Sequence, residues 1–180
     1  MKKISSLFAI ILFLLNTDAQ TWVDSLSSFA HEKYLPAQKF KWTWVNAPLL
    51  RATVLQYEFS NGDAKNYYLS YIQKAMDNKA IRASGTRPNT VAPAHGFAFL
   101  AKVLGQDKYA KLAAKIYADY LKIPRTSVGG ITHLARTPEL WDDTMYMIGV
   151  FLLEMYRYSG DEIYLDELMQ QFQIHREKLL

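Results

Sequence analysis

Two adjacent carboxylates, Asp142 and Asp143, follow Trp141 and are the side chains of this sequence best suited to move a proton. A helical pattern begins beside them, because apolar residues such as Met147 and Phe151 recur at helical spacing. Acids in the first turn of a helix also favour its N-terminus without any chemistry, so a structural role is the alternative for both. Neighbours project about 100° apart around a helix, so we expect only one of them to act.

The helix that carries these acids has a start signal upstream of them. Thr137 is a suitable cap, Pro138 suits the first helical position, and Glu139 favours the first turn. The sequence therefore predicts a helix from Pro138 to Tyr158. The preceding segment, Lys122 to Thr137, is rich in Gly, Pro, Ser and Thr and is expected to be a loop.

Helical periodicity recurs along the chain, whereas strand signals are scarce, so we expect an all-helical fold. The expected helices are Thr21 to Lys33, Ala47 to Phe59, Asp63 to Met76, Ala92 to Leu104, Asp107 to Leu121, Pro138 to Tyr158 and Asp161 to Arg176.

One helix connection is used three times, which indicates an array of helical hairpins. It consists of a Gly that ends one helix, an Asp that caps the next, and a Tyr at the corner. The three copies are Phe59-Ser60-Asn61-Gly62-Asp63 before Tyr67, Leu104-Gly105-Gln106-Asp107 before Tyr109, and Tyr158-Ser159-Gly160-Asp161 before Tyr164.

Composition excludes several classes of function. The chain has 180 residues and a formal charge of +4, with no run of Lys and Arg interleaved with aromatics, so no nucleic-acid partner is expected. It has no cysteine, and its four histidines lack metal-ligand spacing, so no metal is expected. No Gly-rich phosphate loop follows a strand, so no cofactor is expected either.

The N-terminus has the pattern of a secretory signal. Lys2 and Lys3 precede the apolar run Ile4 to Leu15, and a short polar stretch ends in Ala19. We therefore expect a signal peptide over residues 1–19, a single domain over residues 20–180, and a secreted or periplasmic protein of a bacterium. A buried N-terminal helix is the alternative. After cleavage we expect no membrane association.

Several motifs occur in an order that resembles the unsaturated glucuronyl and rhamnogalacturonyl hydrolases of glycoside hydrolase families 88 and 105. Upstream, Trp42-x-Trp44-x-x-Ala47 looks like the families' Trp-x-Tyr-x-x-Gly, and Asn89-x-Val91-x-x-Ala94 stands where they usually have Asp-x-Ile-x-x-Gly. The other matching runs are Pro124-Arg125-Thr126, Gly129-Gly130-Ile131-Thr132-His133, Trp141-x-Asp143-x-Met145-Tyr146-Met147, Gly160-Asp161-x-x-Tyr164 and Gln173-Ile174-His175.

The resemblance implies a fold and a reaction. The fold is an (α/α)6 barrel of six helical hairpins, of which this chain has room for about three. The reaction is hydration of the C4=C5 double bond of an unsaturated uronic acid, which releases it from oligosaccharides made by polysaccharide lyases. The rhamnogalacturonan type is favoured as the substrate.

The resemblance also implies site residues. Asp143 corresponds to the catalytic acid, which must stay partly protonated near neutral pH; we expect burial beside Trp141 to favour the neutral form. His133 is implied to face the sugar as a donor. Asn89 departs from the usual aspartate, so it keeps the hydrogen bonding but loses a charge. Trp44 and Trp141 are candidate stacking platforms for a sugar, with core packing as the alternative.

Some choices stay open. Arg125 and Arg136 both suit a uronate carboxylate, and the sequence does not choose between them. His95 is a weaker candidate for the mouth of the same site. The rival functions are an inactive helical module that binds a glycan or a protein, and another (α/α)6 sugar enzyme such as an epimerase. A half-barrel would leave an apolar edge exposed, so a homodimer is a further hypothesis.

Overall fold

The computed structural model describes residues 22–134 and 136–179, so the expected signal peptide, residues 1–19, lies outside the described residues. The described chain falls into two units, residues 22–36 and residues 37–179. In the first, residues 22–28 are α-helical and continue into η1, a π-helical turn over Phe29–Tyr34. This agrees with the helix expected up to Lys33.

Short helical turns, η2 (Ala37–Lys39) and η3 (Trp44–Asn46), lead into the first hairpin, α2 (Ala47–Phe59) and α3 (Gly62–Asp77). The prediction for α2 is confirmed at both ends. Proline stands in its first turn, where the missing N–H costs nothing.

The second hairpin begins in three steps instead of one. After η4 (Ala80–Arg82), the chain forms α4 (Pro88–Val91), η5 (Ala92–Ala94) and then α5 (His95–Leu104), where one helix from Ala92 was expected. The prolines at positions 88 and 93 explain the break, because each lacks an N–H for the helical ladder. The hairpin is completed by α6 (Asp107–Tyr120).

The third hairpin is α7 (Asp142–Ser159) and α8 (Ile163–Leu179). The expected start of α7 at Pro138 is wrong. The N–H of His133 donates to the carbonyl of Glu139 at 3.0 Å, which holds that segment along the loop. The chain is still extended at Trp141, with φ −126° and ψ 141°, so the helix begins one residue later.

The repeated connection is confirmed in part. Gly105 and Gly160 end α5 and α7 with φ of 63° and 72°, the left-handed conformation that glycine adopts without strain. Asp161 caps the last helix, since its carboxylate accepts the N–H of Ile163 at 3.1 Å. The first copy differs: Gly62 is the first residue of α3, and the helix before it ends at Phe59, with Ser60 as its C-cap. Asp63 and Asp107 lie inside the first turns of α3 and α6 and do not cap them.

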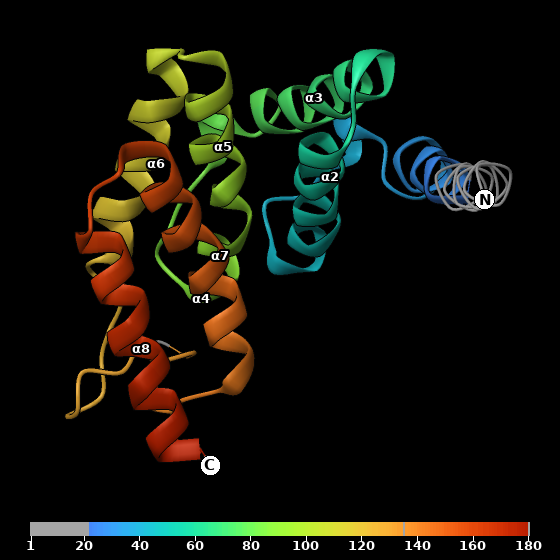
Figure 1. Ribbon diagram of the computed structural model, residues 1–180. Coiled ribbons are helices and arrows are strands. Elements are labelled where there is room, and N and C mark those ends of the chain that lie inside the picture. The colour runs from blue at the N-terminus through green and yellow to red at the C-terminus, as the bar shows by residue number, and fades with distance from the viewer. Residues whose placement is uncertain (1–21, 135, 180) are drawn as a thin grey trace, which may run out of the picture. The chain divides into compact units, whose positions relative to one another are not determined.

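The core is centred on α5, which contacts α6 and α7, while α7 also packs against α8 (Figure 1). The largest apolar side chains there, such as Phe97, Phe99 and Phe151, are almost completely buried. Among the described residues the backbone forms only an isolated bridge, Arg125 to Ile131, and no named strand. The all-helical class is confirmed, and none of the described helices is long and apolar enough to cross a bilayer.

The starts of the inner helices meet at one end of this unit. Ala47 at the start of α2, Ala92 in η5 and Met147 in α7 form one buried cluster. In addition, α4 contacts α7 and η3. The regions that carry Trp44, Asn89 and Asp143 therefore share this end.

Candidate active site

The loop before α7 is held in place by a side chain from α8. Gln171, which is fully buried, accepts the N–H of Ile131 at 2.8 Å and donates to the carbonyl of Gly129 at 3.0 Å. Both backbone groups are thus satisfied away from water. Gly130 is needed at this point, because a Cβ there would lie 2.7 Å from Leu140 and 2.9 Å from Ile174.

This loop delivers His133 to the first turn of α7. The imidazole is 6% exposed and stacks on Trp141, with ring centroids 4.2 Å apart and an interplanar angle of 5°. Its Nδ1 lies 2.9 Å from the hydroxyl of Thr144 and 3.4 Å from a carboxylate oxygen of Asp143. The ring therefore lies beneath the indole and orients the acid; it does not line the open pocket described below.

Asp143 itself is half exposed, because 48% of its side chain is accessible. The expected burial of this acid beside Trp141 is therefore not present, since the indole is itself 41% exposed. The helix begins beneath Asp143, so its carboxyl projects from a rigid first turn. Asp142 has a structural role in the first turn, which was the alternative to a catalytic one: its carboxylate accepts the N–H of Asp143 at 2.8 Å.

An open pocket of about 770 Å³ lies between the start of α7 and the last two turns of α8. One wall comprises Leu140, Trp141, Asp142, Asp143 and Met145, and the other comprises Phe172, His175, Arg176 and Leu179. The pocket has room for a small oligosaccharide. It combines an accessible carboxyl, an indole and a guanidinium, which are groups that suit an acidic sugar.

Trp44 and Asn89 do not line this pocket. Trp44 is 44% exposed in η3, and Asn89 lies in α4, which contacts both η3 and α7. The amide oxygen of Asn89 is buried and has no hydrogen-bond partner among the described residues. Both residues are therefore at the same end of the helices as Asp143, but outside the cavity beside it.

The candidate arginines are also separated by the structure. Arg125 forms an ion pair with Glu167 at 3.0 Å and donates to the carbonyl of Gly129 at 3.2 Å, so it stabilises the loop. Arg136 is exposed and does not line the pocket. Sequence reasoning missed Arg176, which does. The spacing of Phe172, Arg176 and Leu179 along one helical face is the signal that could have found it.

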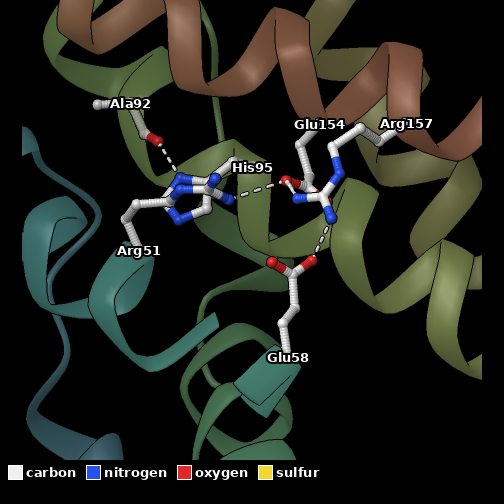
Figure 2. A network of polar contacts seen from close by, with 6 residues as sticks. All are labelled: Arg51, Glu58, Ala92, His95, Glu154 and Arg157. Atoms are coloured by element: carbon white, nitrogen blue, oxygen red, sulfur yellow. Dashed lines mark hydrogen bonds and ion pairs between the residues drawn. The ribbon is translucent and has the colours of Figure 1, made fainter. Parts of the chain in front are cut away.

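A network of buried charges lies further along α7 (Figure 2). The carboxylate of Glu154 is fully buried and accepts from Arg51 at 2.9 Å and from Arg157 at 3.2 Å. Arg157 also pairs with Glu58 at the end of α2. The network joins α2 to α7. Both guanidinium groups bind Oε2 of Glu154 and offset the cost of burying its charge, while Oε1 has no hydrogen-bond partner among the described residues.

His95 lies beside this network and not at the mouth of the site (Figure 2). It is fully buried at the start of α5, and its Nδ1 donates to the carbonyl of Ala92 at 2.7 Å. Burial lowers the pKa of His95 from 6.5 to about 4, and the positive charge of Arg51 acts in the same direction. The neutral ring is part of the core. Among the described residues no group of His, Cys, Asp and Glu could hold a metal ion.

Comparison with known proteins agrees with this fold. The model of Glycosyl Hydrolase Family 88 matches residues 17–180. The chain is 28% identical over 151 residues to the unsaturated rhamnogalacturonyl hydrolase YesR of Bacillus subtilis (strain 168), covering 78% of this chain and 42% of that protein.

A solved structure shares the architecture. It comes from Klebsiella pneumoniae subsp. pneumoniae MGH 78578 and is described as a possible member of the GH105 family. It superposes with a TM-score of 0.66 at 24% identity, over 77% of this chain and 37% of that one. The expected fold, helical hairpins of the six-hairpin glycosidase type, is confirmed. The chain spans less than half the length of either relative.

Proposed function

The chain belongs to glycosyl hydrolase family 88, and on that premise we propose that it releases the unsaturated uronic acid from lyase-generated oligosaccharides by hydrating the C4=C5 double bond. The rhamnogalacturonan type is the favoured substrate, supported by the similarity to an unsaturated rhamnogalacturonyl hydrolase. No cofactor is required by this chemistry. The observation that carries the proposal is the half-exposed carboxyl of Asp143 in a pocket beside Trp141.

Asp143 acts as acid and then as base in this proposal. Its carboxyl gives a proton to C4, and the enol ether becomes an oxocarbenium ion centred on C5 and the ring oxygen. Water then adds to C5, and the carboxylate takes back the proton that this water loses. The resulting hemiketal opens to a ketone and releases the neighbouring sugar, so one residue cycles between two protonation states.

The neighbours of Asp143 position both the acid and the sugar. His133 lies 3.4 Å from the carboxylate and is locked between Trp141 and Thr144, so it restricts the acid to few orientations. The indole of Trp141 has one face on this histidine and can offer the other to a sugar ring. Trp44 and Asn89, at the same end of the helices, are proposed to contact the more distant part of the substrate.

Loss of the ultraviolet absorbance of the C4=C5 uronate tests the proposal directly. We expect decay with unsaturated rhamnogalacturonan disaccharide and the wild-type protein, and a rate lowered by roughly 10²–10⁴ in Asp143→Asn. Asp142→Asn is the matched neighbour, and we expect a far smaller loss. A folded wild-type protein without decay would refute hydration and favour the glycan-binding module instead.

Localisation and assembly are further proposals. Lys2, Lys3 and the apolar run Ile4 to Leu15 support export to the periplasm or beyond. Met169 and Phe172, 57% and 50% exposed on α8, support a homodimer that covers this helix. A monodisperse monomer in light scattering would refute the dimer.

A further inference from the structure

We propose that Arg176, with His175 beside it, forms the subsite that binds the carboxylate of the uronate substrate. The inference rests on the proposed function and extends it, because it names the group that separates acidic sugars from neutral ones. Arg176 supplies the cation for the carboxylate, and His175 supplies a hydrogen-bond acceptor for a neighbouring hydroxyl. Both lie in the wall of the pocket that faces Asp143.

Arg176 is a guanidinium without a structural task. It is exposed on α8 and forms no hydrogen bond or ion pair with the described part of the chain. Other arginines differ, because they form ion pairs: Arg51 and Arg157 with Glu154, and Arg125 with Glu167. A planar guanidinium that is free in a pocket is well suited to grip a carboxylate with two parallel hydrogen bonds.

His175 is the second, independent observation. The side chain is 3% exposed, and its Nδ1 lies 2.8 Å from the carbonyl of Gln171. A carbonyl only accepts, so a ring with one proton carries it on Nδ1 and leaves Nε2 as an acceptor. Nε2 is buried and has no partner among the described residues, which is uncommon for such an atom. His175 is nevertheless one of the residues that line the pocket, so its ring lies at the wall where a sugar would bind.

The chemistry of the substrate gives this subsite its use. An unsaturated uronate carries its carboxylate on C5, directly next to the double bond that must be protonated. A guanidinium that holds the carboxylate on one wall therefore directs C4 toward the opposite wall, where Asp143 lies. Holding both reacting groups in one pocket reduces the entropy cost of their encounter.

The charges of the pocket permit an anion there. The carboxylate of Asp142 accepts the N–H of Asp143 in the first turn of α7. The helix dipole there offsets part of its negative charge. Arg176 is the guanidinium on the other wall of the pocket, and no acid among the described residues pairs with it. A neutral sugar would gain only ordinary hydrogen bonds from it, without the attraction between opposite charges.

The test compares Arg176→Gln and Arg176→Lys on the acidic disaccharide and on its neutral methyl ester. We expect the Gln variant to raise KM for the acid roughly tenfold or more, with kcat changed much less, and to leave the ester unaffected. The Lys variant keeps the charge but loses the fork, so it should fall in between. Lys178→Gln, exposed on the same helix but outside the pocket, is the control. Equal KM values for wild type and Arg176→Gln would overturn the subsite.

Failure of the proposed function is a distinguishable result. If the wild-type protein shows no hydration, binding of galacturonate and galactose is measured by titration calorimetry. Galacturonate that binds the wild type and not Arg176→Gln supports the subsite without the reaction, whereas equal affinity for both sugars, or no binding at all, overturns it. His175→Gln, which keeps an acceptor near the position of Nε2, should bind better than His175→Leu, with thermal unfolding as the check that both fold.

Discussion

Two carboxylates on one helix have opposite environments. Glu154, in the second turn from the end of α7, is fully buried and shared by two arginines, whereas Asp143, in the first turn, has 48% of its side chain accessible. The buried acid is out of reach of a ligand, because it is closed off from solvent and two arginines bind it. The exposed acid is restrained by a stacked histidine but faces a pocket. On this helix, Glu154 therefore joins α7 to α2, whereas Asp143 is available for chemistry.

The largest effect on stability is expected at the buried acid. Glu154→Gln removes the buried carboxylate that Arg51 and Arg157 share and leaves Arg51 without its ion pair, which should cost about 3–5 kcal/mol. Urea unfolding followed by circular dichroism measures this loss. Asp166→Asn, an exposed acid on α8, is the control and should stay within about 0.5 kcal/mol of wild type. A similar stability for both variants would contradict a structural role for Glu154.

A fall in pH should destabilise the folded protein through His95. Its pKa in the folded protein, about 4, lies below 6.5, so between these values the unfolded ring binds a proton that the folded ring does not. Stability from this group is complete above pH 6.5 and is lost as the pH falls toward 4, by about 3 kcal/mol. Unfolding curves from pH 7 to 4 should show a shallower loss in His95→Gln. An identical pH dependence would contradict the buried neutral ring.

The loop beneath the exposed acid should tolerate little added volume. Gly130→Ala places a methyl group 2.7 Å from Leu140 and 2.9 Å from Ile174, so about 1–3 kcal/mol of stability should be lost. The loop also carries His133, so activity should fall as well. Ser127→Ala, exposed in the same loop, is the control that should change neither. If Gly130→Ala kept the melting temperature and the hydration rate of the wild type, the loop would have room for the methyl group and the prediction would be wrong.

The smallest effect is expected at the hydroxyl that holds the histidine. Thr144→Val keeps the shape of the side chain but removes the 2.9 Å contact with His133, which should cost about 1 kcal/mol. Because the histidine orients Asp143, kcat should fall more than KM rises. A rise in KM alone would instead assign Thr144 a role in binding the sugar.

Local signals predicted most of the fold. The limits of α2 and the glycine caps at positions 105 and 160 follow from periodicity and backbone conformation, which nearby residues determine. The predicted start of α7 at Pro138 was wrong, because the hydrogen bond from the N–H of His133 to the carbonyl of Glu139 keeps that segment in the loop. No short sequence pattern describes such a contact.

The site was predictable only in part. The sequence brings Trp141 and Asp143 together because they are neighbours, and the family motif adds His133 from nearby in the chain. Arg176 and the partners of Glu154 come from distant helices, where only the folded chain shows which charges meet. The half-exposed state of Asp143 is likewise a property of packing, which spacing along one helix does not determine.

The most direct test measures Asp143→Asn and Glu154→Gln side by side for uronate hydration and for stability. The account predicts that Asp143→Asn loses the reaction while its unfolding midpoint stays close to that of wild type. Glu154→Gln should lose stability, but at urea concentrations below its unfolding midpoint it should still catalyse uronate hydration. An active Asp143→Asn protein, or a variant whose inactivity is explained by unfolding, would contradict the assignment of Asp143 as the acid.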